Sequence, residues 1–230
     1  MDRSARQARL ERRRGAERRG QMKWVLYIGL AAVVVAGLLI FASRVRTAPE
    51  REYTQANGLS LGDPNAPVQM TEFADFQCPY CYNVYLGAED ELITTYVETG
   101  LVYFTYRPVA FLGPESDGSA EAAICAAEQN EFWPYHDILF ANFSHSNGGG
   151  YSASRLQSMA ETVGLDVAAF QQCLADGVGE AGVLSVEDEA RSLGITGTPA
   201  FVINGTILGG ARTFEELAEV IDAALAASGN

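Results

Sequence analysis

Two cysteines three positions apart, Cys78 and Cys81, are the residues of this sequence that most directly predict a chemistry. A strand-like segment precedes them, and a helical stretch that opens at Cys78 runs toward Glu98. Residues i and i+3 of a helix lie on one face, so two thiols at this spacing can close a disulfide and open it again. Cys78 would lie at the helix N-terminus, where unpaired N–H groups and the positive end of the helix dipole stabilise a thiolate. We therefore predict that Cys78 is the nucleophile and that Cys81, one turn further in, is the resolving thiol.

Two other interpretations of this pair have to be weighed. A single Cys-x-x-Cys is half of a structural zinc site, which would need two more ligands. The remaining cysteines and histidines of the chain are Cys125, Cys173, His136 and His145. None of them forms a second close pair in the sequence, which argues against zinc. A purely structural disulfide is the other alternative, and the strand-then-helix context disfavours it. We expect no metal and no cofactor.

The hydrophobic pattern around the pair predicts an α/β fold. Residues 68–73 and 101–106 are rich in strand formers and flank the predicted helix, which gives a β-α-β unit with a right-handed crossover. A helical block follows, with predicted helices at residues 119–131, 134–143, 153–163, 167–174 and 182–193 and a break or kink at Pro134. A hairpin (200–203 and 206–208 around Asn204-Gly205) and a last helix (213–226) complete the chain. This order predicts an α/β domain with a helical insertion.

Thr198 and Pro199 lie just before the first strand of the predicted hairpin. A proline at the first residue of a strand is tolerated without any special role. A more specific interpretation is that the Thr198–Pro199 bond is cis. Such a proline would remove an N–H beside the thiols, and the backbone of Thr198 would be presented to an extended substrate.

Three segments resemble the DsbA-like thioredoxin-fold oxidoreductases, in the order in which that family has them. They are Phe73–Cys81 around the cysteines, Phe132–Phe140 in the helical block and Gly197–Gly205 across the proline loop. The resemblance covers about residues 60–228. It implies a thioredoxin fold with a helical insertion, and a membrane-tethered thiol–disulfide oxidoreductase that works through the two cysteines. It also implies that Thr198-Pro199 lies at the substrate groove and that a quinone-coupled membrane partner of the DsbB or VKOR type reoxidises the pair.

The dipeptide between the cysteines departs from the best-studied DsbA proteins, which carry a histidine there. This chain has Pro79 and Tyr80. Tyr80 offers neither an imidazolium charge nor a second donor. Because the dipeptide tunes the stability of the thiolate, the resemblance alone does not carry strong oxidising power over to this chain.

Glu72 lies six residues before Cys78. The resemblance implies a buried acid at this position, which helps to move protons for the resolving thiol. On a strand, Glu72 would share a face with Met70, under the helix, and burial would raise its pKa to suit that role. An exposed glutamate at the end of the strand is the alternative. Asp75 is expected only to solvate the connection between strand and helix.

Cys125 and Cys173 lie on two predicted helices of the insertion. In an oxidising compartment, an even remainder of cysteines suggests a disulfide. We expect a structural disulfide, because neither residue has a close cysteine partner or a cationic neighbour in the sequence. Two buried free thiols are the alternative.

The first fifty residues predict a membrane anchor. Residues 24–43 carry no charge, and twenty residues of helix span about 30 Å, the thickness of a bilayer core. Nine Lys or Arg residues precede this run, so the positive-inside rule places the N-terminus in the cytoplasm. A cleaved signal peptide is the alternative, disfavoured by the long apolar run and by Arg46 at the first small position of the cleavage site. The predicted parts are a basic cytoplasmic tail (1–23), a transmembrane signal-anchor (24–43), a linker (44–60) and an extracytoplasmic thioredoxin domain (61–230) whose insertion covers about 115–194.

The charge of the chain divides at nearly the same place. Residues 1–51 hold twelve basic and four acidic residues (+8), and residues 52–230 hold four basic and twenty-five acidic residues (−21). So few basic residues in the domain argue against nucleic-acid binding. We predict that the domain introduces disulfides into extracytoplasmic proteins. A reductase or isomerase kept reduced by a transmembrane electron donor is one alternative, and a non-catalytic thioredoxin-fold chaperone or adaptor is another.

Overall fold

The computed structural model describes residues 24, 27–35, 37, 45–49, 51–53, 55–145 and 147–229. The chain divides into two compact units, Met1–Arg44 and Val45–Asn230. The predicted cytoplasmic tail and much of the predicted signal-anchor lie outside the described residues. Residues 27–35 are helical, and the described part of the chain contains no helix that is both long and apolar enough to cross a membrane.

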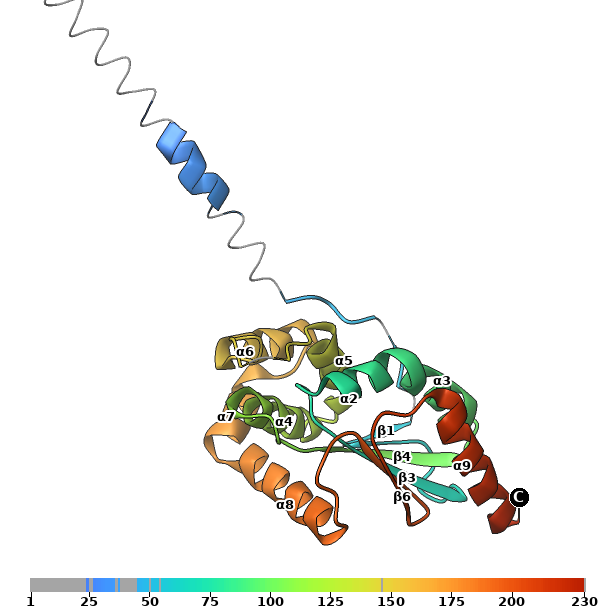
Figure 1. Cartoon of the computed structure of the whole chain (residues 1–230). Helices are drawn as coiled ribbons and strands as arrows, with labels where there is room; N and C mark the ends of the chain where they lie inside the picture. Colours follow the sequence, from blue (N-terminus) through green and yellow to red (C-terminus); the bar gives the residue numbers. More distant parts are fainter. Residues whose placement is uncertain are drawn as a thin grey trace, which may run out of the picture. The chain divides into compact units, whose positions relative to one another are not determined.

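A six-stranded sheet forms the centre of the second unit (Figure 1). Its strands are β1 (Ala56–Asn57), β2 (Ser60–Leu61), β3 (Val68–Ala74), β4 (Val102–Pro108), β5 (Ala200–Ile203) and β6 (Thr206–Gly209), in the spatial order β1-β2-β4-β3-β5-β6. The β3–β4 pair is parallel, as a β-α-β unit requires, and the other neighbouring pairs are antiparallel. Because β3 pairs with β4 on one side and β5 on the other, its last residues, just before Cys78, are held firmly.

The alternation of side chains along β3 gives each face of the sheet its own covering helix. Met70 is buried in the main core together with residues of α9 (Phe214–Ser228). Phe73 points to the opposite face, where it packs in a second apolar cluster with residues of α8 (Val178–Ser192). The strand that leads into the cysteines is therefore covered on both faces.

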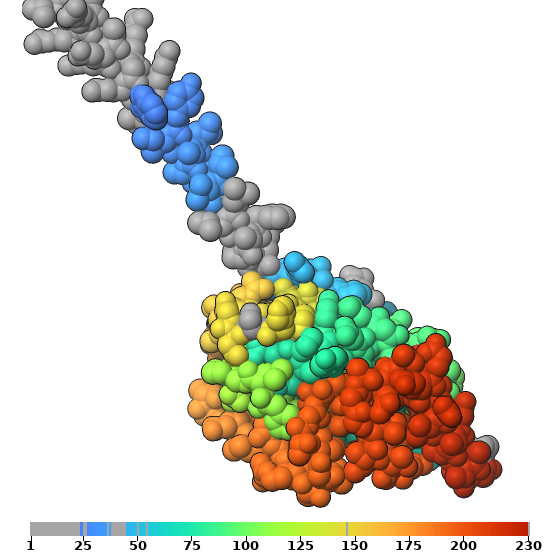
Figure 2. Space-filling view, in the orientation of Figure 1, coloured from blue at the N-terminus to red at the C-terminus, as the bar shows by residue number. Residues whose placement is uncertain are grey.

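The helix that follows the cysteines is continuous but not uniform. It consists of α2 (Pro79–Val84), the wide π turn η1 (Tyr85–Glu89), the short α3 (Asp90–Leu92) and a second π turn, η2 (Ile93–Val97). Glu98 caps its C-terminus, where the sequence predicted the end. The helix packs on β4 and on α9. In Figure 2 its surface, in green, lies between the insertion in yellow and the C-terminal part of the chain in red.

The helical insertion is grouped beside the sheet (Figure 1). Its helices are α4 (Pro114–Ala127), α5 (Phe132–Ala141), α6 (Ala153–Thr162), α7 (Val167–Ala175) and α8 (Val178–Ser192). Three of the predicted starts were too late, because α4 begins at Pro114, α5 at Phe132 and α8 at Val178. The predicted break at Pro134 was wrong. The chain turns instead at Asn130, whose φ is 59°, and Pro134 lies in the first turn of α5, where proline is tolerated.

Cys125 of α4 and Cys173 of α7 form a disulfide, with Cα atoms 5.8 Å apart. The helix α4 packs against α5, α7 and α8, so it is the central helix of the insertion. Cys125 itself is fully buried. The bridge therefore ties the central helix of the insertion to one of its neighbours.

The predicted linker, residues 44–60, is folded onto the domain over its described part. β1 and β2 form a hairpin that pairs with β4. The backbone N–H of Arg46 donates to the side chain of Asn142, and the amide of Asn142 donates to the Arg46 carbonyl, both at 2.8 Å. The hydroxyl of Tyr53 donates to Asp137 at 2.8 Å. The polar composition that suggested a free tether instead serves specific contacts with the folded domain.

The disulfide of the insertion yields a prediction for stability. Replacing Cys125 and Cys173 by alanine should lower the free energy of unfolding by about 4 kcal/mol, because the bridge closes a loop with a sequence separation of 48. Urea unfolding of the domain measures this loss. Both proteins should also carry Cys78→Ala and Cys81→Ala, so that the Cys125–Cys173 bridge is the disulfide on which a reducing agent acts. Reducing this bridge should then lower the free energy of unfolding by the same amount as the alanine substitutions. A change below about 1 kcal/mol would contradict a stabilising role.

Candidate active site

Cys78 is the residue from which α2 begins. Its backbone is extended (φ −76°, ψ 120°), and its carbonyl accepts a helical hydrogen bond from the N–H of Tyr82 at 3.0 Å. Pro79 is the first helical residue, because proline has the φ of a helix start and its missing N–H would be unpaired there. The Cys78 sulfur consequently lies against the free N–H groups of the first turn, and the residue is only 5% exposed.

These surroundings separate the acidities of the two thiols. The pKa of Cys78 falls to about 6, chiefly through a hydrogen bond from Cys81 and against the effect of burial. The side chain of Thr198 and the backbone N–H groups of Tyr80 and Cys81 lower this pKa further. Burial, followed by the neighbouring Cys78, raises the pKa of Cys81 well above its ordinary value. At neutral pH the reduced pair therefore holds a thiolate on Cys78 and a thiol on Cys81.

The Thr198–Pro199 peptide bond is cis. Pro199 immediately precedes β5, and Ala200 of β5 pairs with Phe73 near the end of β3. This pairing brings residue 198 to the cysteines across a sequence separation of 120, and the Cys78 sulfur lies 3.4 Å from the Thr198 carbonyl oxygen, to which it donates when it is protonated. The sheet thus joins two segments that the sequence singled out separately.

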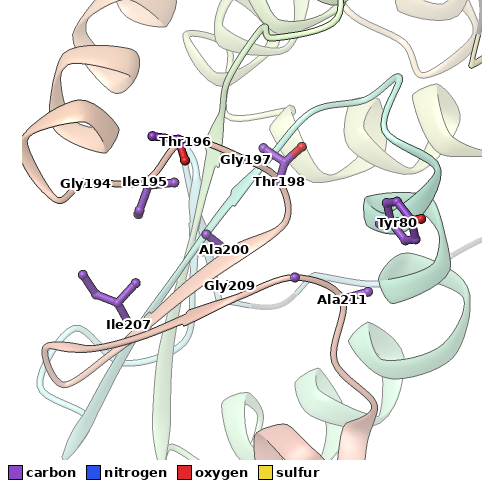
Figure 3. A pocket seen from close by; sticks show the side chains of 11 residues that line it. Tyr80, Gly194, Ile195, Thr196, Gly197, Thr198, Ala200, Ile207, Gly209 and Ala211 are labelled. Atoms are coloured by element: carbon purple, nitrogen blue, oxygen red, sulfur yellow. The ribbon is translucent and has the colours of Figure 1, made fainter.

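A groove of about 620 Å³ opens beside this contact (Figure 3). Its lining residues are Tyr80, Gly194, Ile195, Thr196, Gly197, Thr198, Ala200, Ile207, Gly209, Gly210 and Ala211. Tyr80 is 61% exposed at the edge of the groove that α2 supplies, whereas Pro79 is built into the helix start. All the lining side chains are uncharged, so the groove can accept an extended, neutral stretch of polypeptide next to the thiolate.

Glu72 is 2% exposed and alternates along β3 with Phe73, so it faces the same side of the sheet as Met70. Its pKa is raised to about 8, first by burial and second by Cys78. Its negative charge in turn contributes to the raised pKa of Cys81. Of the two alternatives for this glutamate, the structure therefore has the buried acid, while its part in proton transfer stays a prediction.

Asp75 differs from its expected role, because it is fully buried rather than exposed in a loop. Its carboxylate accepts hydrogen bonds from the N–H groups of Gln77 and Phe111, both at 2.8 Å, and from the hydroxyl of Ser116. Burial raises the pKa of Asp75, and these hydrogen bonds oppose the rise. The sequence could not show this environment, because two of the donors come from segments that only folding brings near.

The structure also holds a buried charge cluster that the sequence did not reveal. His136 lies between two carboxylates, with Nε2 3.4 Å from Glu89 and Nδ1 3.1 Å from Asp137. Nη1 of Arg51 lies 3.3 Å from the Glu89 carboxylate and 3.8 Å from that of Asp137. The available signal was an ionisable pair, His136-Asp137, inside an otherwise apolar predicted helix. The sequence around Arg51 and Glu89 contains no pattern that would have predicted their contact with this pair.

By residue type, Glu89, His136 and Asp137 could hold a divalent cation, since one ligand atom from each lies within 4.8 Å of the others. Arg51, however, already places its positive charge against both carboxylates. Burial raises the pKa of Glu89 to about 8, with His136 as the main opposing influence. A metal ion would have to compete with the guanidinium, so the arrangement is that of an ion-pair cluster.

Comparison with known proteins agrees with this geometry. Residues 54–223 match the family described as thioredoxin. The chain belongs to the thioredoxin family. Its fold is similar to the crystal structure of alpha-DsbA1 from Wolbachia pipientis, with a TM-score of 0.66 and 25% identity over 75% of this chain and 92% of that chain. The DsbA-like resemblance of the three sequence segments thus has a structural counterpart.

Two relatives show the domain in different contexts. Probable disulfide bond formation protein D of Bacillus anthracis is 24% identical over 203 residues, which cover 86% of this chain and 93% of that protein. Na(+)/H(+) antiporter NhaA 3 of Salinispora tropica is 32% identical over 219 residues, which cover 86% of this chain but 32% of that protein. The chain spans about a third of the length of the antiporter, so a segment of this thioredoxin family also occurs within a longer protein.

The buried Glu72 yields a prediction for the pH dependence of stability. Because its pKa is raised to about 8 in the fold, the folded state loses stability as pH rises from the ordinary pKa of 4.5 through 8. In the reduced protein, Glu72→Gln should therefore be neutral below about pH 4 and stabilising by roughly 5 kcal/mol above about pH 9. Urea unfolding across this pH range measures the difference.

The exposed Glu98 offers a matched control for that experiment. Glu98→Gln should change the free energy of unfolding little at any pH, because an exposed carboxylate has no burial penalty to lose. An effect of Glu72→Gln that is the same at low and high pH would mean that Glu72 does not titrate with a raised pKa.

Proposed function

We propose that this protein is a thiol–disulfide oxidoreductase that introduces disulfides into extracytoplasmic proteins. One observation carries the proposal: at the N-terminus of α2, the pKa of Cys78 is lowered to about 6 while that of Cys81 is raised. A substrate thiolate can attack the Cys78 sulfur, and this sulfur is also a good leaving group because its pKa is low. Cys81, whose pKa is raised, stays protonated beside it. The similarity to disulfide bond formation protein D and to alpha-DsbA1 supports the same activity.

The reaction uses one disulfide of the enzyme and two thiols of the substrate. A substrate thiolate attacks the Cys78 sulfur, the Cys78–Cys81 bond breaks and a mixed disulfide forms. Cys81 leaves as a thiolate and takes a proton from Glu72. A second substrate thiolate then attacks the substrate sulfur of the mixed disulfide, and Cys78 leaves as a thiolate. The substrate has lost two electrons, which the reduced Cys78/Cys81 pair now holds.

The acidity of the groups favours this direction. A thiolate whose pKa is about 6 is largely ionised at pH 7, which stabilises the reduced enzyme relative to its disulfide. The enzyme disulfide is therefore readily passed to substrates. Glu72, with a pKa of about 8, holds a proton at neutral pH, as protonation of the departing Cys81 requires. The neutral groove beside Thr198 would hold the substrate chain while both steps occur.

We also propose that residues 24–43 anchor the chain in the cell membrane by a single pass, with the N-terminus in the cytoplasm and the catalytic domain outside. The charge-free run, the basic residues before it and the −21 charge of residues 52–230 support this topology. Outside the cytoplasm no thiol pool keeps the cysteine pair reduced. A quinone-coupled membrane protein of the DsbB or VKOR type would then take up the two electrons and restore the disulfide.

Two serine variants test the reaction. Cys78→Ser should reduce the oxidation of a dithiol peptide to the uncatalysed rate, because the attacked sulfur is gone. Cys81→Ser should instead accumulate a mixed disulfide when it is mixed with a disulfide-containing peptide, visible on a non-reducing gel, because the Cys78 thiolate breaks the peptide disulfide and the resolving thiol is missing. The Cys125→Ala/Cys173→Ala variant is the control and should keep its activity. Full activity of Cys78→Ser in cells would favour a chaperone or adaptor, and a mostly reduced pair in cells would favour a reductase.

Cysteine accessibility tests the topology. In a Cys78→Ser/Cys81→Ser background, a membrane-impermeant maleimide should label Ser192→Cys in intact cells, because residue 192 is exposed on the domain. Ser4→Cys, in the basic tail, should be labelled only after the cells are permeabilised. Labelling of Ser4→Cys in intact cells, or protection of Ser192→Cys, would contradict the proposed orientation.

A further inference from the structure

The carboxylate of Asp75 joins three separate segments around the active-site loop. It is fully buried and accepts hydrogen bonds from Gln77 in its own loop, from Phe111 in the loop after β4 and from Ser116 in the first turn of α4. Burying a carboxylate is costly unless donors replace its water. Because Asp75 has three hydrogen-bond donors and lies three positions before the nucleophile, we regard its carboxylate as part of the architecture of the active site.

The first of these contacts shapes the turn that delivers Cys78 to the helix. The Asp75 carboxylate accepts from Gln77 N–H at 2.8 Å, and the Asp75 carbonyl accepts from Cys78 N–H at 2.9 Å. An aspartate that bonds the backbone two residues ahead closes the chain into a defined turn. Both acceptors of Asp75 therefore determine where Cys78 enters the first turn of α2, and thus which N–H groups its sulfur meets.

The second contact holds a surface loop in register with that turn. Three consecutive backbone N–H groups of the loop donate hydrogen bonds. Val109 donates to the carbonyl of Ala74 at 2.9 Å, Ala110 to the carboxylate of Glu187 at 3.3 Å and Phe111 to the carboxylate of Asp75 at 2.8 Å.

The same loop presents two large apolar side chains to solvent. Phe111 is 40% exposed and Leu112 is 45% exposed.

We propose that Asp75 is a positioning residue for Cys78, and that its carboxylate fixes the loop of Val109–Phe111 against the turn that carries the nucleophile. This inference rests on the oxidoreductase function proposed above. The carboxylate of Asp75 acts on Cys78 through the turn and the loop, while the Asp75 backbone also hydrogen-bonds Cys81. Its loss should therefore alter the acidity of Cys78.

The sign of the change in Cys78 acidity separates positioning from simple electrostatics. If Asp75 acted on Cys78 only by its negative charge, its removal would stabilise the thiolate and lower the pKa of Cys78. If Asp75 holds the turn, its removal takes the sulfur away from its donors and raises that pKa. A residue that only stabilised the fold would lower the melting temperature and leave the pKa where it was.

The experiment measures the pKa of Cys78 from thiolate absorbance against pH, together with KM and kcat for a dithiol peptide, in wild type, Asp75→Ala, Asp75→Asn and Asp117→Asn. Wild type should titrate at about 6. Asp75→Ala should raise this pKa by about 1 unit or more, because the sulfur loses its donors, and should lower kcat with the peptide, because a more basic Cys78 leaves the mixed disulfide less readily. Asp75→Asn should shift the pKa in the same direction by less, because its amide oxygen can still accept from Gln77. Asp117→Asn removes an exposed charge from the same turn of α4 and should change neither quantity.

Either a lower or an unchanged pKa of Cys78 in the Asp75 variants overturns the proposal. If Asp75→Ala does not fold, the isosteric Asp75→Asn tests the proposal by the direction in which the pKa of Cys78 changes. The two proposals fail separately. A wild type without peptide oxidation defeats the oxidoreductase function, whereas the pKa comparison still tests the positioning of Cys78 by Asp75.

Discussion

A thiolate that lies almost out of water has to be stabilised by donors that are fixed before it forms. Cys78 is 5% exposed, and burial alone would raise its pKa. The hydrogen bond from Cys81 outweighs burial, with help from Thr198 and the first turn of α2. Each of these donors depends on a different part of the fold, namely the helix start at Pro79, the helical spacing to Cys81 and the strand that follows Thr198. Cys78 is reactive only where all three are assembled.

Burial dominates the groups behind Cys78, and their pKa values move the other way. Glu72 is 2% exposed on the inner face of β3, and its pKa is raised to about 8. Cys81 is 1% exposed, and its pKa is raised as well. A charge on one of these groups disfavours a charge on the others, so the site keeps its single negative charge on the sulfur at the helix terminus. Protons and negative charge are thereby kept on different groups within one small site.

The same requirement explains why the segment before the sheet is part of the domain. Glu89 and Asp137 are each 2% exposed, and buried carboxylates need a cation or donors close by. Arg51 supplies the cation and Tyr53 donates to Asp137, so the chain ahead of β1 is drawn onto the helix that carries Cys81 and onto α5. A segment with the composition of a linker is therefore ordered by the charges that it neutralises.

The sequence by itself determined the features that depend on neighbours along the chain. These were the helix start at Cys78-Pro79, the parallel β3–β4 unit, the hairpin at Asn204-Gly205 and the order strand, helix, strand, insertion, hairpin, helix. Only the tertiary structure decided that Glu72 is buried, that Asp75 meets donors at residues 111 and 116, and that Arg51 meets Glu89. The reason is physical: turns and helix starts are governed by interactions within a few residues, whereas burial and the partners of a buried charge belong to the assembled core.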